Sequence, residues 1–194
     1  MVKKNAGLYL TGGIIAVSII AGFLILFFFQ GKGQIKKGAF EPPPVGVSST
    51  KSLEYRQVHL YFADCNNEYL MAETRSLALE KDDPLLFAET IIQALINGPR
   101  TNLTRTLPDG TVLTAVYLDE RKIAYLDFSA EISENHPGGV MTEWLSIYSI
   151  INSLILNIDE IRAVKILINH QEAQTLAGHI DLQKPFKANM LLVR

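Results

Sequence analysis

The chain has 194 residues, of which 48% are hydrophobic, and its 18 basic and 20 acidic side chains give a formal net charge of -2. A chain so close to neutral lacks the basic excess with which proteins bind nucleic acid, so no nucleic-acid partner is expected. Its single cysteine, Cys65, cannot form an intramolecular disulfide and offers no metal cluster. The apolar residues gather in one early block, so the two parts of the chain are interpreted separately.

A charge-free segment, LYLTGGIIAVSIIAGFLILFFF, occupies residues 8–29 behind a short flank at 1–7. A helix of this length, at about 1.5 Å per residue, spans a hydrocarbon core of about 30 Å, so we predict one transmembrane anchor. Lysines flank the segment on both sides, so charge does not set its orientation. The short N-terminal flank favours a single pass through the cytoplasmic membrane, with the C-terminal domain outside the cytoplasm.

A cleaved signal peptide is the competing interpretation of this segment. It requires a shorter apolar region followed by small residues, whereas Phe27, Phe28 and Phe29 stand at the end of this one. A lipoprotein attachment would need a cysteine there, and the sequence has none at that place. An uncleaved anchor is therefore favoured.

Residues 30–56 are rich in Gly, Lys, Pro and Ser and show no helical or strand periodicity, so they are predicted to be a linker. Pro42, Pro43 and Pro44 favour an extended polyproline II conformation, which makes this tether semi-rigid. The remaining residues, 57–194, are enough to bury a core of their own.

The first half of this domain predicts a hairpin followed by a helix. Residues 58–62 alternate between apolar and polar and indicate a half-buried strand, and residues 69–79 form a second strand. Asp83 is placed to cap a helix that begins at Pro84. The Asn97-Gly98-Pro99 sequence should end that helix, because Gly98 can adopt the left-handed conformation and Pro99 cannot continue a helix.

The second half repeats this order. Residues 111–118 and 122–128 predict a second hairpin, and an amphipathic helix carrying apolar residues from Trp144 to Ile158 follows Pro137-Gly138-Gly139. The apolar run within 163–168 suits a central strand, and residues 190–193 predict a short last strand. The expected fold class is α+β, a two-layer arrangement with a mixed, mainly antiparallel sheet that carries both helices on one face.

The motifs of this domain resemble those of the GerMN domain family over roughly residues 58–186. The matching segments, in chain order, are Leu60-Tyr61-Phe62, Glu73-x-Arg75, Leu95-Ile96-Asn97-Gly98-Pro99, Leu107-Pro108-Asp109-Gly110-Thr111, Ala124-Tyr125-Leu126-Asp127-Phe128-Ser129, Gly138-Gly139 with Glu143, and Gly178-x-x-Asp181-Leu182-x-x-Pro185-Phe186. The chain departs from the family at two turns where a glycine is frequent, at Asp119-Glu120-Arg121 and at Asn169-His170. Asn169 tolerates a positive φ, so the second turn can be kept.

The resemblance implies an extracytoplasmic, membrane-attached accessory domain of the bacterial envelope without recognised catalysis. In spore formers the family is implicated in assembling an envelope-spanning complex during sporulation, and elsewhere it occurs beside cell-wall amidase domains. The expected function is therefore a non-enzymatic binding or scaffolding module whose partners are envelope proteins or peptidoglycan. A peptidoglycan hydrolase, or a regulator of one, is the alternative.

Four sets of residues are candidates for chemical sites. His59, Asp64 and Cys65 are close in sequence, but no oxyanion motif accompanies a thiol nucleophile there. The histidines at 136, 170 and 179 lack the spacing of zinc ligands. The glutamates at 131, 134 and 143 could imitate a glycosidase carboxylate pair, but acidic residues before a helix also stabilise its positive end. Gly138-Gly139 could hold an anion but lacks the lysine of a phosphate loop.

Two further motifs are expected to be structural. Asp127 and Ser129 should accept hydrogen bonds from backbone amides where their strand ends. Glu73 and Arg75 share one strand face and should form a surface ion pair of little energetic weight. No residue is assigned to catalysis, cofactor binding or metal binding, and no cofactor is expected.

Overall fold

The computed structural model describes residues 54–79 and 83–194. The predicted anchor at 8–29, the flank before it and nearly all of the linker at 30–56 lie outside these residues. Within the described part, no helix combines the length and the apolar character that crossing a bilayer requires.

The elements follow each other in the predicted order, with two short helices added. They are β1 Glu54–Ala63, β2 Leu70–Leu79, α2 Pro84–Ile96, β3 Leu113–Leu118, β4 Ile123–Phe128, α3 Glu131–Glu134, α4 Val140–Ile155, β5 Ala163–Ile168 and the 3₁₀ helix η1 Met190–Leu192. The cap is confirmed, since the Asp83 carboxylate accepts hydrogen bonds from the Leu85 and Leu86 amides. The turn at Asn169 is confirmed as well, with φ of 52°.

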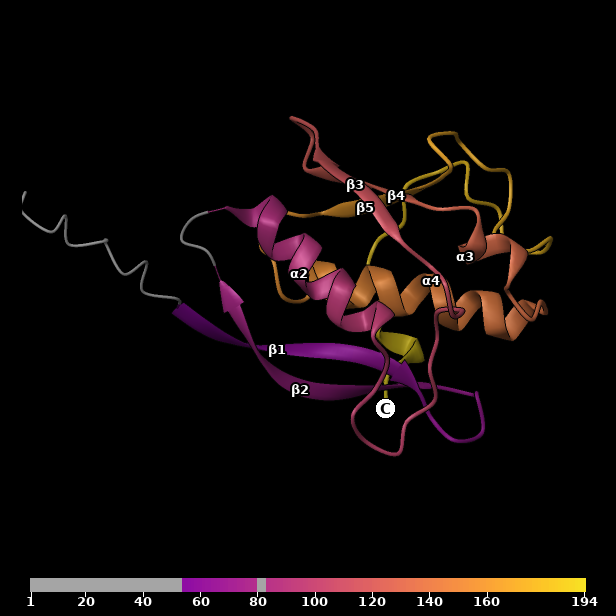
Figure 1. Cartoon of the computed structure of the whole chain (residues 1–194), viewed down its shortest axis with the longest axis horizontal. Coiled ribbons are helices and arrows are strands. Elements are labelled where there is room, and N and C mark those ends of the chain that lie inside the picture. The colour runs from indigo at the N-terminus through magenta and orange to yellow at the C-terminus, as the bar shows by residue number, and fades with distance from the viewer. Residues whose placement is uncertain (1–53, 80–82) are drawn as a thin grey trace, which may run out of the picture. The chain divides into compact units, whose positions relative to one another are not determined.

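The strands form two sheets, where the sequence predicted one. β1 and β2 pair antiparallel as a hairpin, while β3, β4 and β5 form a second sheet with β3 antiparallel and β5 parallel to β4. Figure 1 shows α2 and α4 between the hairpin and the three-stranded sheet. The prediction that both helices cover one face of a single sheet was therefore wrong, although the α+β class and the mainly antiparallel pairing are confirmed.

The outer edge of β1 explains why the hairpin stays separate. α4 and the residues after it run along this edge. The side chain of Asn157, two residues beyond the end of α4, accepts from the His59 amide at 3.0 Å and donates to the His59 carbonyl at 2.8 Å. Four residues nearer the start of the helix, the Ser153 hydroxyl accepts from the Tyr61 amide at 3.0 Å. Four helical residues rise about 6 Å and two strand residues about 6.6 Å, so the helix matches the strand and takes the place of a third one.

The core lies on both sides of the helical layer. Val58, Leu60 and Phe62 on β1 are fully buried with Ile91, Ile92 and Leu95 on α2, Ile147, Ile150 and Ile151 on α4, and Leu126, Phe128, Val164 and Ile166 of the upper sheet. Each helix therefore buries apolar residues toward two layers, which is why the α2 stripe is broad.

Two strand predictions need correction. β5 was expected to be central, but it is the last strand of its sheet, and its outer side makes isolated bridges only, from Val164 to Phe186 and from Ile168 to Gln171. Residues 190–192 form η1 and not a strand, and only Val193 makes a bridge, to Leu70.

Candidate functional site

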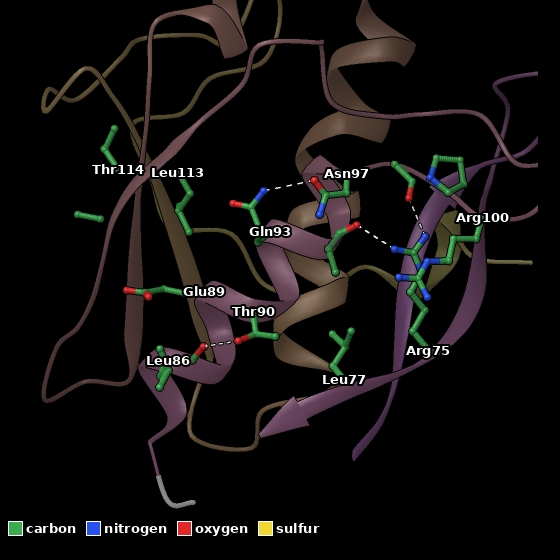
Figure 2. A pocket seen from close by; sticks show the side chains of 14 residues that line it. Arg75, Leu77, Leu86, Glu89, Thr90, Gln93, Asn97, Arg100, Leu113 and Thr114 are labelled. Atoms are coloured by element: carbon green, nitrogen blue, oxygen red, sulfur yellow. Dashed lines mark hydrogen bonds between the residues drawn. The ribbon is translucent and has the colours of Figure 1, made fainter. Parts of the chain in front are cut away.

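A groove of about 620 Å³ opens over the outer face of α2. We call it the α2 groove. It is lined from β2 by Arg75 and Leu77, from α2 and the residues after it by Leu86, Glu89, Thr90, Gln93, Ala94, Asn97, Gly98, Pro99 and Arg100, and from β3 by Leu113, Thr114 and Ala115. Both sheets thus contribute a wall, and α2 is the floor (Figure 2).

The β2 wall is held by a buried ion pair. Arg75 and Glu73 have side chains that are only 4% and 5% exposed, and the Arg75 Nη2 atom lies 2.5 Å from the Glu73 Oε1 atom. The guanidinium also donates to the carbonyls of Ala94 at 3.0 Å and Gly98 at 2.6 Å, which are among the unpaired acceptors at the end of α2. The predicted pair therefore exists, but it is buried and not on the surface.

The Glu73 carboxylate fixes the loop that forms the far rim. It accepts hydrogen bonds from the Arg100 amide at 2.9 Å and from the Thr101 amide and hydroxyl at 2.9 Å and 2.6 Å. Burial raises the pKa of this carboxyl, but hydrogen bonds, led by those of Thr101 and Arg75, outweigh burial and lower the pKa below its ordinary value. Glu73 is therefore negatively charged and holds the loop at Arg100 and Thr101 in place.

Gly98 is required where helix and rim meet. Its φ is 85°, the left-handed conformation predicted from the sequence. A Cβ at this position would lie 2.8 Å from the Arg105 guanidinium, which donates to the Ile96 carbonyl at 2.5 Å. A larger residue would push this arginine away from the helix end.

The open surface of the groove is polar but mostly uncharged. Gln93 and Asn97 are exposed on the floor, and their side chains are linked by a hydrogen bond of 3.4 Å. Glu89 and Arg100 are exposed at opposite ends of the groove, and Gln93 and Asn97 lie between them (Figure 2). The side-chain amides of Gln93 and Asn97 can donate and accept hydrogen bonds, so the floor of the groove is suited to binding a polar ligand.

The residues weighed as a thiol site are not brought together. The His59 ring bonds to the Thr74 hydroxyl at 3.1 Å in the middle of the hairpin. Asp64 accepts from the Glu68 and Tyr69 amides at 2.8 Å and 3.1 Å and so shapes the β1–β2 turn. Cys65 is exposed in that turn.

The histidines lie apart in structural roles. The His136 Nδ1 atom accepts from the Gly138 amide at 3.0 Å, so its Nε2 atom carries the proton and donates to the Ser146 hydroxyl at 3.0 Å. This tautomer cannot act as a base toward Ser146. Among the described residues, no cluster of three or more His, Cys, Asp or Glu side chains has the geometry to hold a metal ion.

Two buried carboxylates hold the C-terminal loops. Glu143, fully buried on α4, accepts from the Ile180 amide at 3.1 Å and from the His179 ring at 2.5 Å. Asp127 accepts from the His170 amide at 2.9 Å, and the Ser129 hydroxyl accepts from the Val112 amide at 3.1 Å, which confirms the roles predicted for the end of β4. Burial raises the Glu143 and Asp127 pKa values, but hydrogen bonds outweigh burial and lower both.

The remaining glutamates belong to α3, where Glu131 and Glu134 occupy the short helix before the Gly-Gly turn. Gly138 and Gly139 have φ of 76° and 97° and lead into α4. The Thr142 hydroxyl donates to the Gly139 carbonyl at 2.8 Å. The turn thus starts the helix, and its Gly138 amide is already bonded to His136.

Sequence reasoning did not single out the α2 groove. Its floor residues are ordinary polar positions of an amphipathic helix, and only Asn97-Gly98-Pro99 stood out, as a helix end. The Glu73-x-Arg75 motif is visible in the sequence, but only the β1–β2 register of the structure places both charges on the strand face of Leu60, toward the helices.

The family comparison supports the resemblance. The sequence model of the Germane family, described as sporulation and spore germination, matches residues 59–174, which is more than half of the chain. No curated protein is similar enough in sequence to count as a match.

Three solved structures share the fold. A protein of Clostridium perfringens described as a lipoprotein candidate is 26% identical with a TM-score of 0.50, over 69% of this chain and 87% of that one. The tandem GerMN domains of the sporulation protein GerM from Bacillus subtilis are 20% identical with a TM-score of 0.53, and 69% of this chain covers 46% of that protein. The first of these domains alone is 19% identical with a TM-score of 0.52, over 69% and 98%.

At 20% and 19% identity, the two GerM structures are evidence for the fold of this chain and not for its function. This chain spans about half of the length of the tandem GerM structure. The family model and the fold agree on the same part of the chain. The chain therefore belongs to the Germane family of sporulation and spore germination proteins, and its described part has the GerMN fold.

Proposed function

We propose that this chain is a non-enzymatic binding module of the bacterial cell envelope, tethered to the cytoplasmic membrane by residues 8–29, which presents the α2 groove to an envelope partner. The observation that carries the proposal is the construction of the groove. Its walls are fixed by a buried ion pair, while its floor and rims leave exposed amide and charged groups. Rigid walls around unused hydrogen-bonding groups favour binding, because little freedom is lost when a partner docks.

The other ionisable groups support a non-enzymatic role. Glu73, Asp127 and Glu143 are committed to backbone amides of neighbouring loops. His136 donates to Ser146 and so does not activate it. A hydrolase needs an acid or base that can reach a substrate, and these groups hold the fold instead.

The proposal is tested with the full chain in bacterial membranes. The groove variant is Glu89→Lys/Arg100→Glu, and a matched control, Glu160→Lys/Arg162→Glu, makes the same charge changes at exposed positions between α4 and β5. After cross-linking, wild type and control should capture the same envelope protein, and the groove variant should lose at least tenfold of it. Equal capture by all three would contradict a role for the groove.

Two further measurements test the other parts of the proposal. Alkaline phosphatase fused after Arg194 should be active, because the domain is proposed to lie outside the cytoplasm, and an inactive fusion overturns this. Incubation with purified peptidoglycan should release no soluble fragments. Released fragments would favour the hydrolase alternative.

A further inference from the structure

The edge of β3 beside the α2 groove has no strand partner in the described part of the chain. β3 pairs with β4 on one side and is the first strand of its sheet. The start of β3, at Leu113, Thr114 and Ala115, lines the groove, and the register with β4 shifts between Leu113 and Ala115. Such a bulge bends a strand, and here it does so at the groove wall.

The register shows which backbone groups face outward. The Asp119 amide donates to the Ile123 carbonyl at 3.0 Å at the closed end of the hairpin. Hydrogen-bonded pairs alternate along an antiparallel ladder, so Tyr117, opposite Tyr125, also bonds to β4. The backbone groups of Val116 and Leu118 therefore point away from β4 and can pair with another strand. These two residues follow Ala115, the last residue of β3 that lines the groove, so a paired strand would extend past the groove along β3.

The β2 wall is different. Arg75 lies opposite Val58 and Leu77 lies opposite Arg56, so both side chains project from the helix-facing side of the hairpin. They border the groove with side chains and not with a free backbone edge. Strand pairing within the groove is thus available on β3.

The polar groups of the groove define what an added strand must carry. Glu89 on α2 and Asn97, the residue that caps the end of this helix, are eight residues apart, about 12 Å along the helix axis, and Arg100 follows three residues later. An extended peptide rises about 3.3 Å per residue, so four to five of its residues cover this distance. If the bound peptide carries a basic and an acidic side chain four residues apart, both side chains lie on the same face of its strand. The basic one can then face Glu89 and the acidic one Arg100.

We propose that the α2 groove binds an extended segment of a partner protein, which pairs with the free edge of β3 and places a basic and an acidic side chain against Glu89 and Arg100. This inference rests on the proposed binding function and names its ligand. None of the fourteen lining residues is aromatic, which disfavours a glycan because sugar rings stack on aromatic faces. Peptidoglycan peptides contain D-residues, whose preferred φ values mirror those of a ladder of L-residues.

The test uses the full chain in detergent micelles and two capped peptides. Their sequences are Thr-Lys-Thr-Val-Thr-Glu-Thr and Thr-Glu-Thr-Val-Thr-Lys-Thr, each carrying a fluorophore whose anisotropy reports binding. Wild type should prefer one of the two by about tenfold, because one order of charges matches Glu89 and Arg100 and the other opposes them. Glu89→Lys/Arg100→Glu should invert this preference, while Glu160→Lys/Arg162→Glu should keep it.

Backbone pairing is tested with two N-methylated forms of the preferred peptide. In one form the backbone amides of the second, fourth and sixth residues, which are Lys, Val and Glu, are methylated. In the other form the amides of the third, fifth and seventh residues, all threonines, are methylated. Only one edge of an added strand faces β3, so one form should lose at least tenfold of its binding and the other should keep it. Equal behaviour of the two forms, or the absence of binding by both unmodified peptides, overturns the inference.

The outcomes separate this inference from the proposed function. If the cross-linked envelope protein is lost in the groove variant but the peptides do not bind, the module still binds through its groove and the strand-pairing inference is wrong. If the peptides bind with inverted preference but no envelope protein is captured, the inference holds and the proposed envelope role is contradicted.

Discussion

β1 and β3 both lack a strand on one side, and the difference lies in what covers that side. Three alternate residues of β1 are bonded to Asn157, Ser153 and the backbone of Thr104, so its edge is closed by the chain itself. In the described part of the chain, the edge of β3 has no such partner, and the start of this strand, at Leu113, Thr114 and Ala115, lines a groove with exposed charged rims. A closed edge prevents pairing with other chains, whereas an open edge beside a groove is a place where pairing can be selective.

The groove depends on its buried ion pair, and breaking it should have the largest effect. Arg75→Met leaves the Glu73 carboxylate buried without its cation and frees two carbonyls, that of Ala94 in the last turn of α2 and that of Gly98 just after the helix. Removing one partner of a buried pair costs about 3–5 kcal/mol. Urea denaturation of the full chain, followed by the fluorescence of Trp144, should show this loss in the free energy of unfolding.

The double variant Glu73→Gln/Arg75→Met is the control for that loss, because it removes the stranded charge. It should recover part of the stability that Arg75→Met loses. A single variant that loses less than about 1 kcal/mol would mean that the pair does not hold the wall.

The closed edge of β1 should be the next most sensitive. Asn157→Ala removes the hydrogen bonds to the His59 amide and carbonyl and one to the Ser153 carbonyl at 2.8 Å. We expect a loss of about 2 kcal/mol, and about 1 kcal/mol for Ser153→Ala, which removes one bond. Thermal unfolding measures both, with the exposed Asn66→Ala as control.

The opened β1 edge should also promote self-association, which sedimentation velocity can detect. A monomeric Asn157→Ala variant of unchanged stability would show that the two edges do not differ as we describe.

The sequence predicted the elements well because their signals are local. Asp83 and Pro84 start α2 and Gly98 ends it through interactions within a few residues. The separation into two sheets was missed, because the bonds between His59 and Asn157 connect positions 98 residues apart. No periodicity reveals that side chains at the end of α4 and just after it take the place of a strand.

The candidate site was missed for a related reason. Glu73 and Arg75 alternate with the small residues Ala72, Thr74 and Ser76, and such a pattern does not show which face of the strand is buried. Only the pairing with β1 shows that the two charged residues share a face with Leu60. Glu89, Gln93 and Asn97 are unremarkable on an exposed helix face. They form a groove only because β3 returns beside them from later in the chain.

His136 should make a smaller contribution that depends on pH. Burial lowers its pKa from the ordinary value of 6.5, and the nearby Glu143 carboxylate opposes this shift only in part. Between the lowered pKa of the folded chain and pH 6.5, the unfolded chain therefore binds more protons than the folded chain. The stability that neutral His136 contributes is fully present above pH 6.5 and is lost as the pH falls from 6.5 to the lowered pKa. One proton limits the slope to about 1.4 kcal/mol per pH unit.

His136→Gln should flatten this part of the stability profile while an amide oxygen still accepts from the Gly138 amide. The measurement is the free energy of unfolding of both proteins by urea titration from pH 7.5 downward. Parallel profiles would show that His136 does not titrate differently in the folded and unfolded chains.

The rim of the groove should matter least to stability, and this sharpens the contrast with the β1 edge. Glu89 and Arg100 are exposed, and Arg100 bonds to Glu73 through its backbone amide, which any side chain at this position retains. Glu89→Lys/Arg100→Glu should therefore change the free energy of unfolding by less than about 0.5 kcal/mol in urea. A loss as large as that of Asn157→Ala would mean that the rim charges stabilise the fold and are not reserved for a partner.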